Sequence, residues 1–503
     1  MFEDQTRPAL GGTAAAAQIA RERRRADQAN ARAERERHRA QLATERARVA
    51  EARLAEFEAS ASWRMTWAVR RLAYAVPRPL YAMLRSAPGL LSRAARGGSR
   101  GHAPRSAMLP AAEAAGGHRP SHRRSAALLI DDHWPRPDRD SGSIDIANLA
   151  QALSDLGFDV AFGADRDHAA DAPGRDGLAA KGIHCLGPAD APSVSAFLER
   201  EGGRFALVVL NRVYAGGRFM EEVRRHCTGA RVVFNTIDVH HLRVRREAEL
   251  HGDAAGLAAA DATRQREEAL AREADATVVV SDAERRLLAP AAPGANFVVL
   301  PLARDVRSPT TAFEKRSGIG FIGGFAHAPN IDALRFFLAE VWPLIQHEDP
   351  RCEFSIVGAD LPADVLAAAP KGVRYLGPID DTAPWFESLR LTVAPLRYGA
   401  GVKGKVVSSL AAGVPCVATP IAVEGMGLGD GDGVLVAATP DLLAGRVLRI
   451  HGDAALWESL SRRGLAEMAA RFSPAPWRRS LAEALWEMDV LPDAGGCDPA
   501  RTD

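Results

Sequence analysis

From Ser125 onward, short apolar runs alternate with helical stretches, and this alternation constrains the fold more than any other feature of the sequence. Apolar runs separated by helices are typical of a parallel sheet that is covered on both faces. The intervening segments, including Ile144–Leu156 and Arg245–Glu273, predict helices. Strands are predicted at Ala126–Ile130, Val160–Gly163, Phe205–Leu210, Arg231–Ile237 and Thr277–Val280.

The same texture repeats after a polar stretch that follows Pro301. We therefore predict an α/β protein with two Rossmann-like, doubly wound domains facing a cleft, at residues 125–305 and 306–480, followed by a helix end and tail at 481–503. Ligands of open α/β sheets bind at the carboxyl ends of the strands. The second set of strands is predicted at Gly320–Ile322, Glu353–Val357, Val373–Leu376, Leu391–Ala394, Cys416–Thr419 and Val434–Val436.

The net charge of +1 over 503 residues conceals a strong asymmetry. Residues 1–125 hold 24 Arg and 11 acidic residues, a net charge of +13, which leaves −12 for the remainder. A basic arm and an acidic globule are expected to do different jobs. The five cysteines are dispersed without a CxxC pair, and no stretch approaches the roughly 20 apolar residues of a membrane span. These features predict a cytoplasmic protein with reduced thiols.

Residues 1–61 predict a long helical arm, because no Gly or Pro occurs between Thr13 and Val76. An alanine seam buries little area, so two interpretations stay open: a weak coiled coil that forms a homodimer through residues 13–60, or a solvated single helix. The seam repeats every seven residues at Ile19, Ala26, Ala33, Ala40, Ala47 and Leu54.

Residues 62–124 form a basic aromatic segment and a linker. Residues 62–96 mix Trp, Tyr and Leu with arginines and lack acidic residues. This composition suits an anionic membrane surface, while packing against the globular domains is the alternative. Nucleic-acid binding is not favoured, because no recognised module accompanies the charge. Residues 97–124 are rich in Gly, Ala and Pro and predict a flexible linker.

The densest candidate site is the segment Pro395–Lys405, which follows a predicted strand and precedes a predicted helix at Val406–Ala412. Glycines at 399 and 401 allow the backbone to approach a ligand, and a helix N-terminus offers unpaired N–H groups. The pattern predicts a diphosphate site, with a glycine-rich turn and solvated lysines as the alternative. The charged residues of this segment are Arg397, Lys403 and Lys405.

Two further loops of the second domain follow strands. Glu424 and Gly425 come after the strand at 416–419, where the carboxylate is predicted either to accept hydrogen bonds from sugar hydroxyls or to lie on the surface. Gly323 and Gly324 make room at the end of another strand. Asn330 is expected to cap the next helix. His327, which lies between Gly324 and Asn330 in the sequence, is interpreted either as a phosphate contact or as a structural histidine.

In the first domain, the loop 131–143 follows the first strand, and Gly142 and Ser143 are predicted to offer free N–H groups to the cleft. Its aspartates lack calcium-loop spacing and alternate with arginines, which favours ion pairs over a metal, and no metal is predicted. Asp238 and His240 follow another strand and suit acid/base work or substrate positioning. Adjacent His240 and His241 cannot both face the cleft.

The segments FIGGFAHAPNIDAL and APLRYGAGVKGKVVSSLAAGVPCVATPIAVEGM, together with FNTIDVHHLRVRREAEL, resemble bacterial group 1 glycosyltransferases (glycosyltransferase family 4, GT-B fold). The resemblance covers about 125–485. It implies a nucleotide-sugar donor held mainly by the second domain, a C-terminal helix that crosses back to the first domain, and transfer with retention of configuration, without a metal or other cofactor.

By position, the resemblance places Gly142 and Ser143 near the donor phosphates and Asp238 and His240 near the reacting sugar. Many members carry two glutamates separated by seven residues where this chain has Ala400 and Ser408. A serine can bond a ribose hydroxyl but cannot make the two-oxygen contact of a carboxylate. The resemblance also assigns phosphate or sugar contacts to Arg397, Gly399, Gly401, Lys403, Lys405, Glu424 and Gly425.

The function expected is transfer of a sugar to a glycan or lipid-linked acceptor in cell-surface polysaccharide or lipopolysaccharide biosynthesis. Asp238, His240, Lys405 and Glu424 are the expected catalytic residues. The expected location is the cytoplasm, or the inner face of the cytoplasmic membrane. Two alternatives stay open: a nucleotide-sugar 2-epimerase of the same fold, and a scaffold that binds nucleotide sugars without turnover.

Deletion of residues 1–96 tests the interpretation of the arm. We expect the truncated protein to keep its activity on soluble acceptors and to lose association with anionic vesicles, because the aromatic and arginine side chains of 62–96 are gone. Vesicle co-sedimentation of the full and truncated chains measures this. Undiminished sedimentation of the truncated chain would contradict the interpretation.

Overall fold

The structure is a computed structural model, and it describes residues 125–169 and 173–491, which belong to one compact unit. The predicted helical arm (1–61), the basic aromatic segment and linker (62–124) and the end of the tail lie outside the described residues. Within the described ranges, no helix is both long enough and apolar enough to span a bilayer.

The first half of the described chain, here called the N-lobe, is built on a seven-stranded sheet in the order β3-β2-β1-β4-β5-β6-β7, and every pair is parallel. Its strands are β1 (Ala126–Asp131), β2 (Asp159–Ala164), β3 (His184–Cys185), β4 (Phe205–Asn211), β5 (Arg231–Asn235), β6 (Ala276–Val279) and β7 (Phe297–Val299). The intervening α-helices are α4 (Ser141–Asp155), α5 (Pro173–Ala179), α6 (Val194–Glu201), α7 (Met220–His226), α8 (His240–His251), α9 (Ala254–Glu273) and α10 (Asp282–Leu288).

The second half, here called the C-lobe, repeats the plan with a six-stranded parallel sheet in the order β10-β9-β8-β11-β12-β13. Its strands are β8 (Gly318–Ile322), β9 (Phe354–Val357), β10 (Val373–Gly377), β11 (Leu389–Ala394), β12 (Cys416–Ala418) and β13 (Val434–Val436). Its α-helices are α11 (Ala328–Phe336), α12 (Trp342–Glu348), α13 (Ala363–Ala367), α14 (Ala383–Ser388), α15 (Gly404–Ala411), α16 (Pro440–Gly452) and α17 (Ala454–Arg471).

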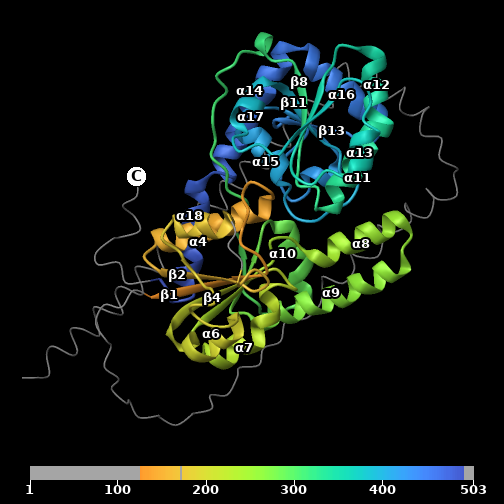
Figure 1. The fold of residues 1–503 in the computed structure, drawn as a ribbon. Helices are drawn as coiled ribbons and strands as arrows, with labels where there is room; N and C mark the ends of the chain where they lie inside the picture. Colours follow the sequence, from red (N-terminus) through yellow and green to blue (C-terminus); the bar gives the residue numbers. More distant parts are fainter. Residues whose placement is uncertain (1–124, 170–172, 492–503) are drawn as a thin grey trace, which may run out of the picture. The chain divides into compact units, whose positions relative to one another are not determined.

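Helices flank the sheet of each lobe, as Figure 1 shows, because the strands are apolar on both faces. In β1, Ala127 and Leu129 belong to one core, while the alternate residues Ala126, Leu128 and Ile130 belong to another. Successive side chains of a strand point to opposite faces, so a fully apolar strand requires a cover on both sides. The predicted pair of doubly wound α/β domains is therefore confirmed.

Two predicted elements differ from the structure. The strand expected at 231–237 ends at Asn235, because Ile237 adopts a left-handed backbone conformation with φ of 63°. The helix expected at 245–273 is two helices, since α8 ends at Gly252, whose φ is 68°, and Asp253 caps α9. The short strands β3 and β7 are not among the predicted strands.

The chain passes between the lobes twice. The first passage follows β7, and the second follows α17 and leads into α18 (Pro474–Glu487), which packs on the N-lobe core. The amide of Arg304 in the first passage donates to the carbonyl of Phe472 in the second, at 2.7 Å. Trp477 and Leu481 of α18 lie in the same core as Leu129 and Leu153 of the N-lobe.

Replacement of Leu481 by alanine tests whether α18 is part of the N-lobe core. Leu481 is 4% exposed, and burial of this kind is worth about 2–5 kcal/mol in a Leu→Ala change. We therefore expect a clear fall in the melting temperature. Leu442→Ala on α16, at a side chain that is 55% exposed, is the matched control and is expected to change little. Equal shifts for the two variants would contradict the assignment.

Candidate functional site

Two helix N-termini, one from each lobe, meet where the carboxyl ends of the two sheets face each other. Helix α4 begins at Ser141 and helix α15 begins at Gly404. A Cβ added to Gly404 would overlap the side chain of Ser141, so the lobes touch at this point and only glycine fits. Helix N-termini present unpaired N–H groups and a partial positive charge, which attract anions.

The predicted free amides at the start of α4 need correction. Asp140 is the N-cap of α4, and its carboxylate accepts from the amide of Ser143 at 2.9 Å and from the Ser143 hydroxyl at 2.6 Å. The Ser143 amide is therefore not free. Gly142 is tightly enclosed: a Cβ there would lie 3.1 Å from Ile237 and 3.2 Å from the guanidinium of Arg212.

The remaining charges of the loop 131–143 form ion pairs. Arg136 donates to Asp138 at 2.8 Å, and Arg139 lies 3.3 Å from the same carboxylate. In residues 125–169 and 173–491, one group of three potential metal ligands occurs, Asp349, Cys352 and His451, with ligand atoms within 4.8 Å of one another. Cys352 precedes β9, so this group lies at the opposite edge of the C-lobe sheet from α15.

Lys405, in the first turn of α15, joins three predicted residues into one cluster. Its ammonium donates to the side-chain oxygen of Asn330 at 2.5 Å and lies 4.3 Å from the ring centre of Phe321. A Cβ at Gly323 would lie 3.1 Å from the same ammonium. Burial, with a smaller effect of Lys403, lowers the pKa of Lys405 to about 7. The structure thus places a half-buried cation beside the glycines at the end of β8.

Asn330 is not the cap of α11, contrary to the prediction. The helix begins at Ala328, and His327 occupies the N-cap position, because Pro329 suits the first turn. Asn330 lies inside the first turn, where its side-chain amide donates to the carbonyl of Gly324 at 2.7 Å. A Cβ at Gly324 would lie 2.5 Å from the carbonyl oxygen of Arg139 in the N-lobe. Asn330 therefore links the glycine turn to Lys405.

Lys403 turns back on its own loop. Its ammonium donates to the carbonyls of Ala400 at 3.0 Å and Gly401 at 2.6 Å, and burial lowers its pKa to about 8. Gly399 and Gly401 have φ values of 146° and 68°, which favour glycine. A Cβ at Gly401 would lie 3.0 Å from the Cβ of Asp238 in the N-lobe. Lys403 shapes this loop rather than presenting a bare charge.

Asp238 and His240 form an ion pair at the start of α8. Nδ1 of His240 lies 2.8 Å from Oδ1 of Asp238, and Nε of Arg243 lies 3.3 Å from Oδ2. Burial opposes ionisation of Asp238, but His240 and Arg243 outweigh it and lower the pKa of the carboxyl. Burial likewise opposes protonation of His240, and Asp238 nevertheless raises its pKa. The pair therefore favours the charged, hydrogen-donating form of His240.

His327 of the C-lobe approaches this pair through Arg243. The distance from Nη1 of Arg243 to Nδ1 of His327 is 3.3 Å. Burial and the charge of Arg243 lower the pKa of His327 to about 4, so the ring is neutral near pH 7. The structure thus brings Asp238, His240 and His327 together at one place between the lobes.

Two buried glutamates that no local sequence pattern predicts hold the start of α8. Glu267 on α9 is fully buried and accepts from the amides of His240 at 2.7 Å and His241 at 3.2 Å, and its Oε2 lies 2.5 Å from Nδ1 of His241. Glu284 on α10 accepts from the amides of Val239 at 3.2 Å and Val280 at 3.0 Å, and burial raises its pKa to about 7. These two carboxylates can be identified only from the amides that they contact in the folded structure.

Four other predicted residues, all in the described part of the chain, make no side-chain hydrogen bond or ion pair with Lys405. Arg397 donates to Asp332 at 2.9 Å and lies 5.4 Å from the ring centre of Phe336, so its charge is neutralised within the C-lobe. Ala400 is buried beside Lys403. The hydroxyl of Ser408 is half-buried and has no hydrogen-bond partner among the described residues. A Cβ at Gly425 would meet the Ser281 hydroxyl of the N-lobe at 2.8 Å.

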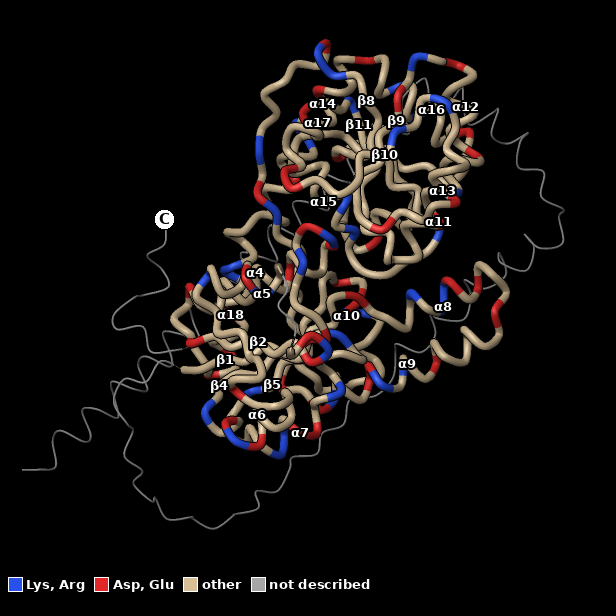
Figure 2. The backbone as a smooth tube through the Cα atoms, in the orientation of Figure 1, with Lys and Arg blue, Asp and Glu red and all other residues tan. Residues whose placement is uncertain are grey.

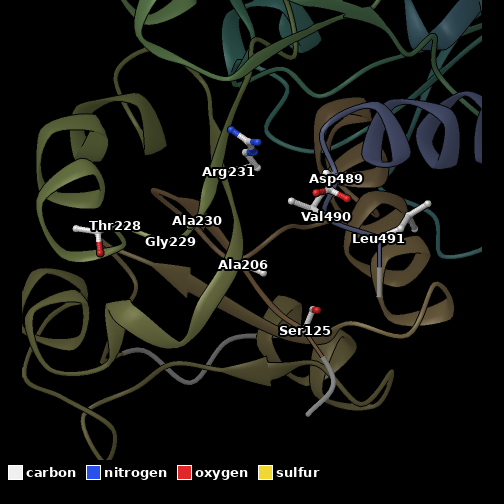
Figure 3. Close-up of a pocket in the computed structure, with 9 residues that line it drawn as sticks. All are labelled: Ser125, Ala206, Thr228, Gly229, Ala230, Arg231, Asp489, Val490 and Leu491. Atoms are coloured by element: carbon white, nitrogen blue, oxygen red, sulfur yellow. The ribbon is translucent and has the colours of Figure 1, made fainter. Parts of the chain in front are cut away.

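Glu424 is paired across the lobes. Its carboxylate accepts from both terminal nitrogens of Arg246 on α8, at 2.6 and 2.8 Å. Elsewhere along α8 and α9, basic and acidic residues are interspersed, as the colours of the backbone in Figure 2 show. Figure 3 shows a pocket of about 340 Å³ at the opposite edge of the N-lobe sheet, near the beginnings of β1 and β5, which shares no residue with these clusters. It is lined by Ser125, Ala206, Thr228–Arg231 and Asp489–Leu491.

Part of the C-lobe matches the model of a known protein family. Residues 316–453 match the family model described as group 1 glycosyl transferases, and no curated protein sequence matches the chain. Sucrose-phosphate synthase from Thermosynechococcus elongatus is 15% identical with a TM-score of 0.58, over 73% of this chain and 99% of that one. Anabaena HepE in complex with UDP-glucose is 13% identical with a TM-score of 0.54, over 72% and 99%.

A glycosyltransferase from Rickettsia africae is 11% identical with a TM-score of 0.51, over 73% of this chain and 99% of that one. At such identities the likeness establishes the fold, which is the GT-B fold of two Rossmann-like domains. The fold and the matched domain define the class of protein: the chain is a glycosyltransferase. Its C-lobe, from Arg316 to Asp453, carries the group 1 glycosyltransferase domain.

Replacement of Glu267 by glutamine tests whether this carboxylate stabilises the start of α8. The glutamine amide presents a donor where the carboxylate accepts, so at least one buried partner loses its bond, at about 1–3 kcal/mol. We expect a lower melting temperature. Glu268→Gln is the matched control, because that neighbour is partly exposed and pairs with Arg264 at 3.4 Å. Equal melting temperatures for Glu267→Gln and Glu268→Gln would contradict the proposed role of Glu267.

Proposed function

We propose that this glycosyltransferase transfers a sugar from a nucleotide-diphosphate sugar to a glycan or lipid-linked acceptor, with retention of configuration and without a metal. The observation that carries the proposal is the meeting of α4 and α15 beside Lys405. The N-terminus of α15, which has no side-chain cap, and the half-buried ammonium of Lys405 supply positive charge for a diphosphate without a bound cation. The GT-B likeness to HepE, which was solved with UDP-glucose, supports this class of donor.

In the proposed reaction, the bond between the anomeric carbon and the diphosphate oxygen breaks, a bond to the acceptor oxygen forms, and the proton of the acceptor hydroxyl passes to the departing diphosphate. Negative charge grows on the departing diphosphate. Preorganised positive charge at that point is usually the largest catalytic contribution. Lys405 and the first turn of α15 would provide it, while the closed contact at Gly404 would limit the entry of water.

Asp238 and His240 are proposed to orient the transferred sugar. Nδ1 of His240 is held by Asp238 at 2.8 Å, and the other ring nitrogen is therefore oriented to donate to a sugar oxygen. Ala400 and Ser408 stand where related enzymes place two glutamates. Ser408, whose hydroxyl has no partner among the described residues, is the proposed ribose contact. Participation in cell-surface glycan synthesis at the inner face of the cytoplasmic membrane is proposed from the resemblance and from the basic composition of residues 62–96.

Ligand-induced stabilisation of Lys405 variants tests the donor site. UDP, GDP, ADP and dTDP are the probes, and a ligand at a hundred times its Kd stabilises the folded state by about 2.7 kcal/mol. We expect at least one to raise the melting temperature of the native chain. Lys405→Met should lose this rise and at least about tenfold in turnover, while Lys371→Met, at an exposed lysine of the C-lobe, should keep both.

The lowered pKa of Lys405 also predicts the direction in which donor affinity changes with pH. The free enzyme holds Lys405 near a pKa of 7, and a bound diphosphate favours the ammonium form. Binding above pH 7 therefore takes up a proton, and affinity should fall as the pH rises from 7 to 9. Lys405→Arg should flatten this slope, since a guanidinium stays charged. No stabilisation by any nucleotide would refute the proposed donor class, and free epimerised sugar as the product would favour an epimerase.

A further inference from the structure

Arg246 is one of the N-lobe residues that contact the loop expected to hold the donor. It lies on α8, and its Nη1 donates to the carbonyl of Gly399 at 2.7 Å and to Glu424 at 2.6 Å. Its Nη2 donates to the second oxygen of Glu424 at 2.8 Å. The side chains of Arg246 and Glu424 are 23% and 37% exposed, so the pair is open to solvent from one side.

The neighbouring contacts keep α8 against this loop independently of that pair. The hydroxyl of Tyr398 donates to Glu247, the residue after Arg246, at 2.9 Å. His251, one turn further along α8, lies edge-on to the ring of Tyr398 with centroids 6.1 Å apart. Arg246 can therefore exchange its partner while the helix stays in place.

The charges around the loop favour such an exchange. Lys403 and Arg246 both lie at this loop, and Glu424 is the carboxylate that faces Arg246. A guanidinium binds carboxylate and phosphate with the same two-pronged geometry. A diphosphate carries more negative charge than one carboxylate, so it competes effectively for the same guanidinium.

We infer that Arg246 is a ligand of the donor diphosphate, supplied by the opposite lobe, and that Glu424 occupies its guanidinium until the diphosphate displaces it. This inference rests on the proposed function. The displaced carboxylate of Glu424 is then free to accept hydrogen bonds from the donor sugar. Binding of the donor and release of Glu424 are thus one step, in which no covalent bond changes.

The exchange predicts opposite effects for the two partners on binding. Removal of the Glu424 charge removes a competitor, so Glu424→Gln should bind inorganic pyrophosphate and the stabilising nucleoside diphosphate about threefold to tenfold more tightly, with reduced turnover. Removal of the guanidinium removes a ligand, so Arg246→Gln should bind both probes about tenfold or more weakly. Arg245→Gln, at an exposed neighbour that pairs with Glu249 at 3.0 Å, is the control with unchanged affinity.

Isothermal titration calorimetry measures these affinities on the full chain. Weaker binding by Glu424→Gln, or native affinity in Arg246→Gln, would overturn the inference. A crystal structure with pyrophosphate is the second measurement: Arg246 on a phosphate oxygen with Glu424 turned away supports the exchange, and an intact Arg246–Glu424 pair overturns it. If Lys405 governs nucleotide binding and Arg246 does not, the inference fails alone. If no nucleotide binds the native chain, the proposed function fails with it.

Discussion

The arrangement between the lobes depends on the hydrogen bonds that the buried carboxylate of Glu267 accepts from the start of α8. This carboxylate binds the two amides that open α8, and with them it fixes the residues that the helix presents to the C-lobe. His240, Arg243 and Arg246 lie at intervals of three residues along α8, so one helical face carries all three. Displacement of the start of α8 would move the Asp238 pair and the contact with Glu424 together.

The cations of the site differ in what holds them. Lys403 binds carbonyls of its own loop, and Arg397 is neutralised by Asp332. Among residues 125–169 and 173–491, the ammonium of Lys405 contacts the amide oxygen of Asn330 and the ring of Phe321. An ammonium without a charged partner in a half-buried position is expensive to maintain. Its low pKa reports that cost, and an incoming anion would relieve it. Among the lysines and arginines of the predicted phosphate loop, Lys405 therefore has the strongest electrostatic reason to receive a ligand.

The sequence was sufficient for the architecture because the relevant signals are local. Five consecutive apolar residues in β1 and a glycine-rich turn after β11 can each be identified within one segment of the chain. The partners of the site are not local: Glu267 is 27 residues from His240, and Glu424 is 178 residues from Arg246. Arg397 is predicted as a ligand because its neighbours are glycines and lysines, while the carboxylate that it contacts in the structure, Asp332, lies 65 residues away.

The hydrogen bond between Arg304 and Phe472 has a consequence for movement. Two passages of the chain connect the lobes, and this bond ties them to each other at one place. A single tether would permit twisting and sliding, whereas two tethers joined at a point restrict the lobes to swinging about that point. Since α18 belongs to the N-lobe core, the last helix of the described residues is part of this pivot. Fusions or truncations at the C-terminus would therefore alter the movement of the lobes before they altered the reacting groups.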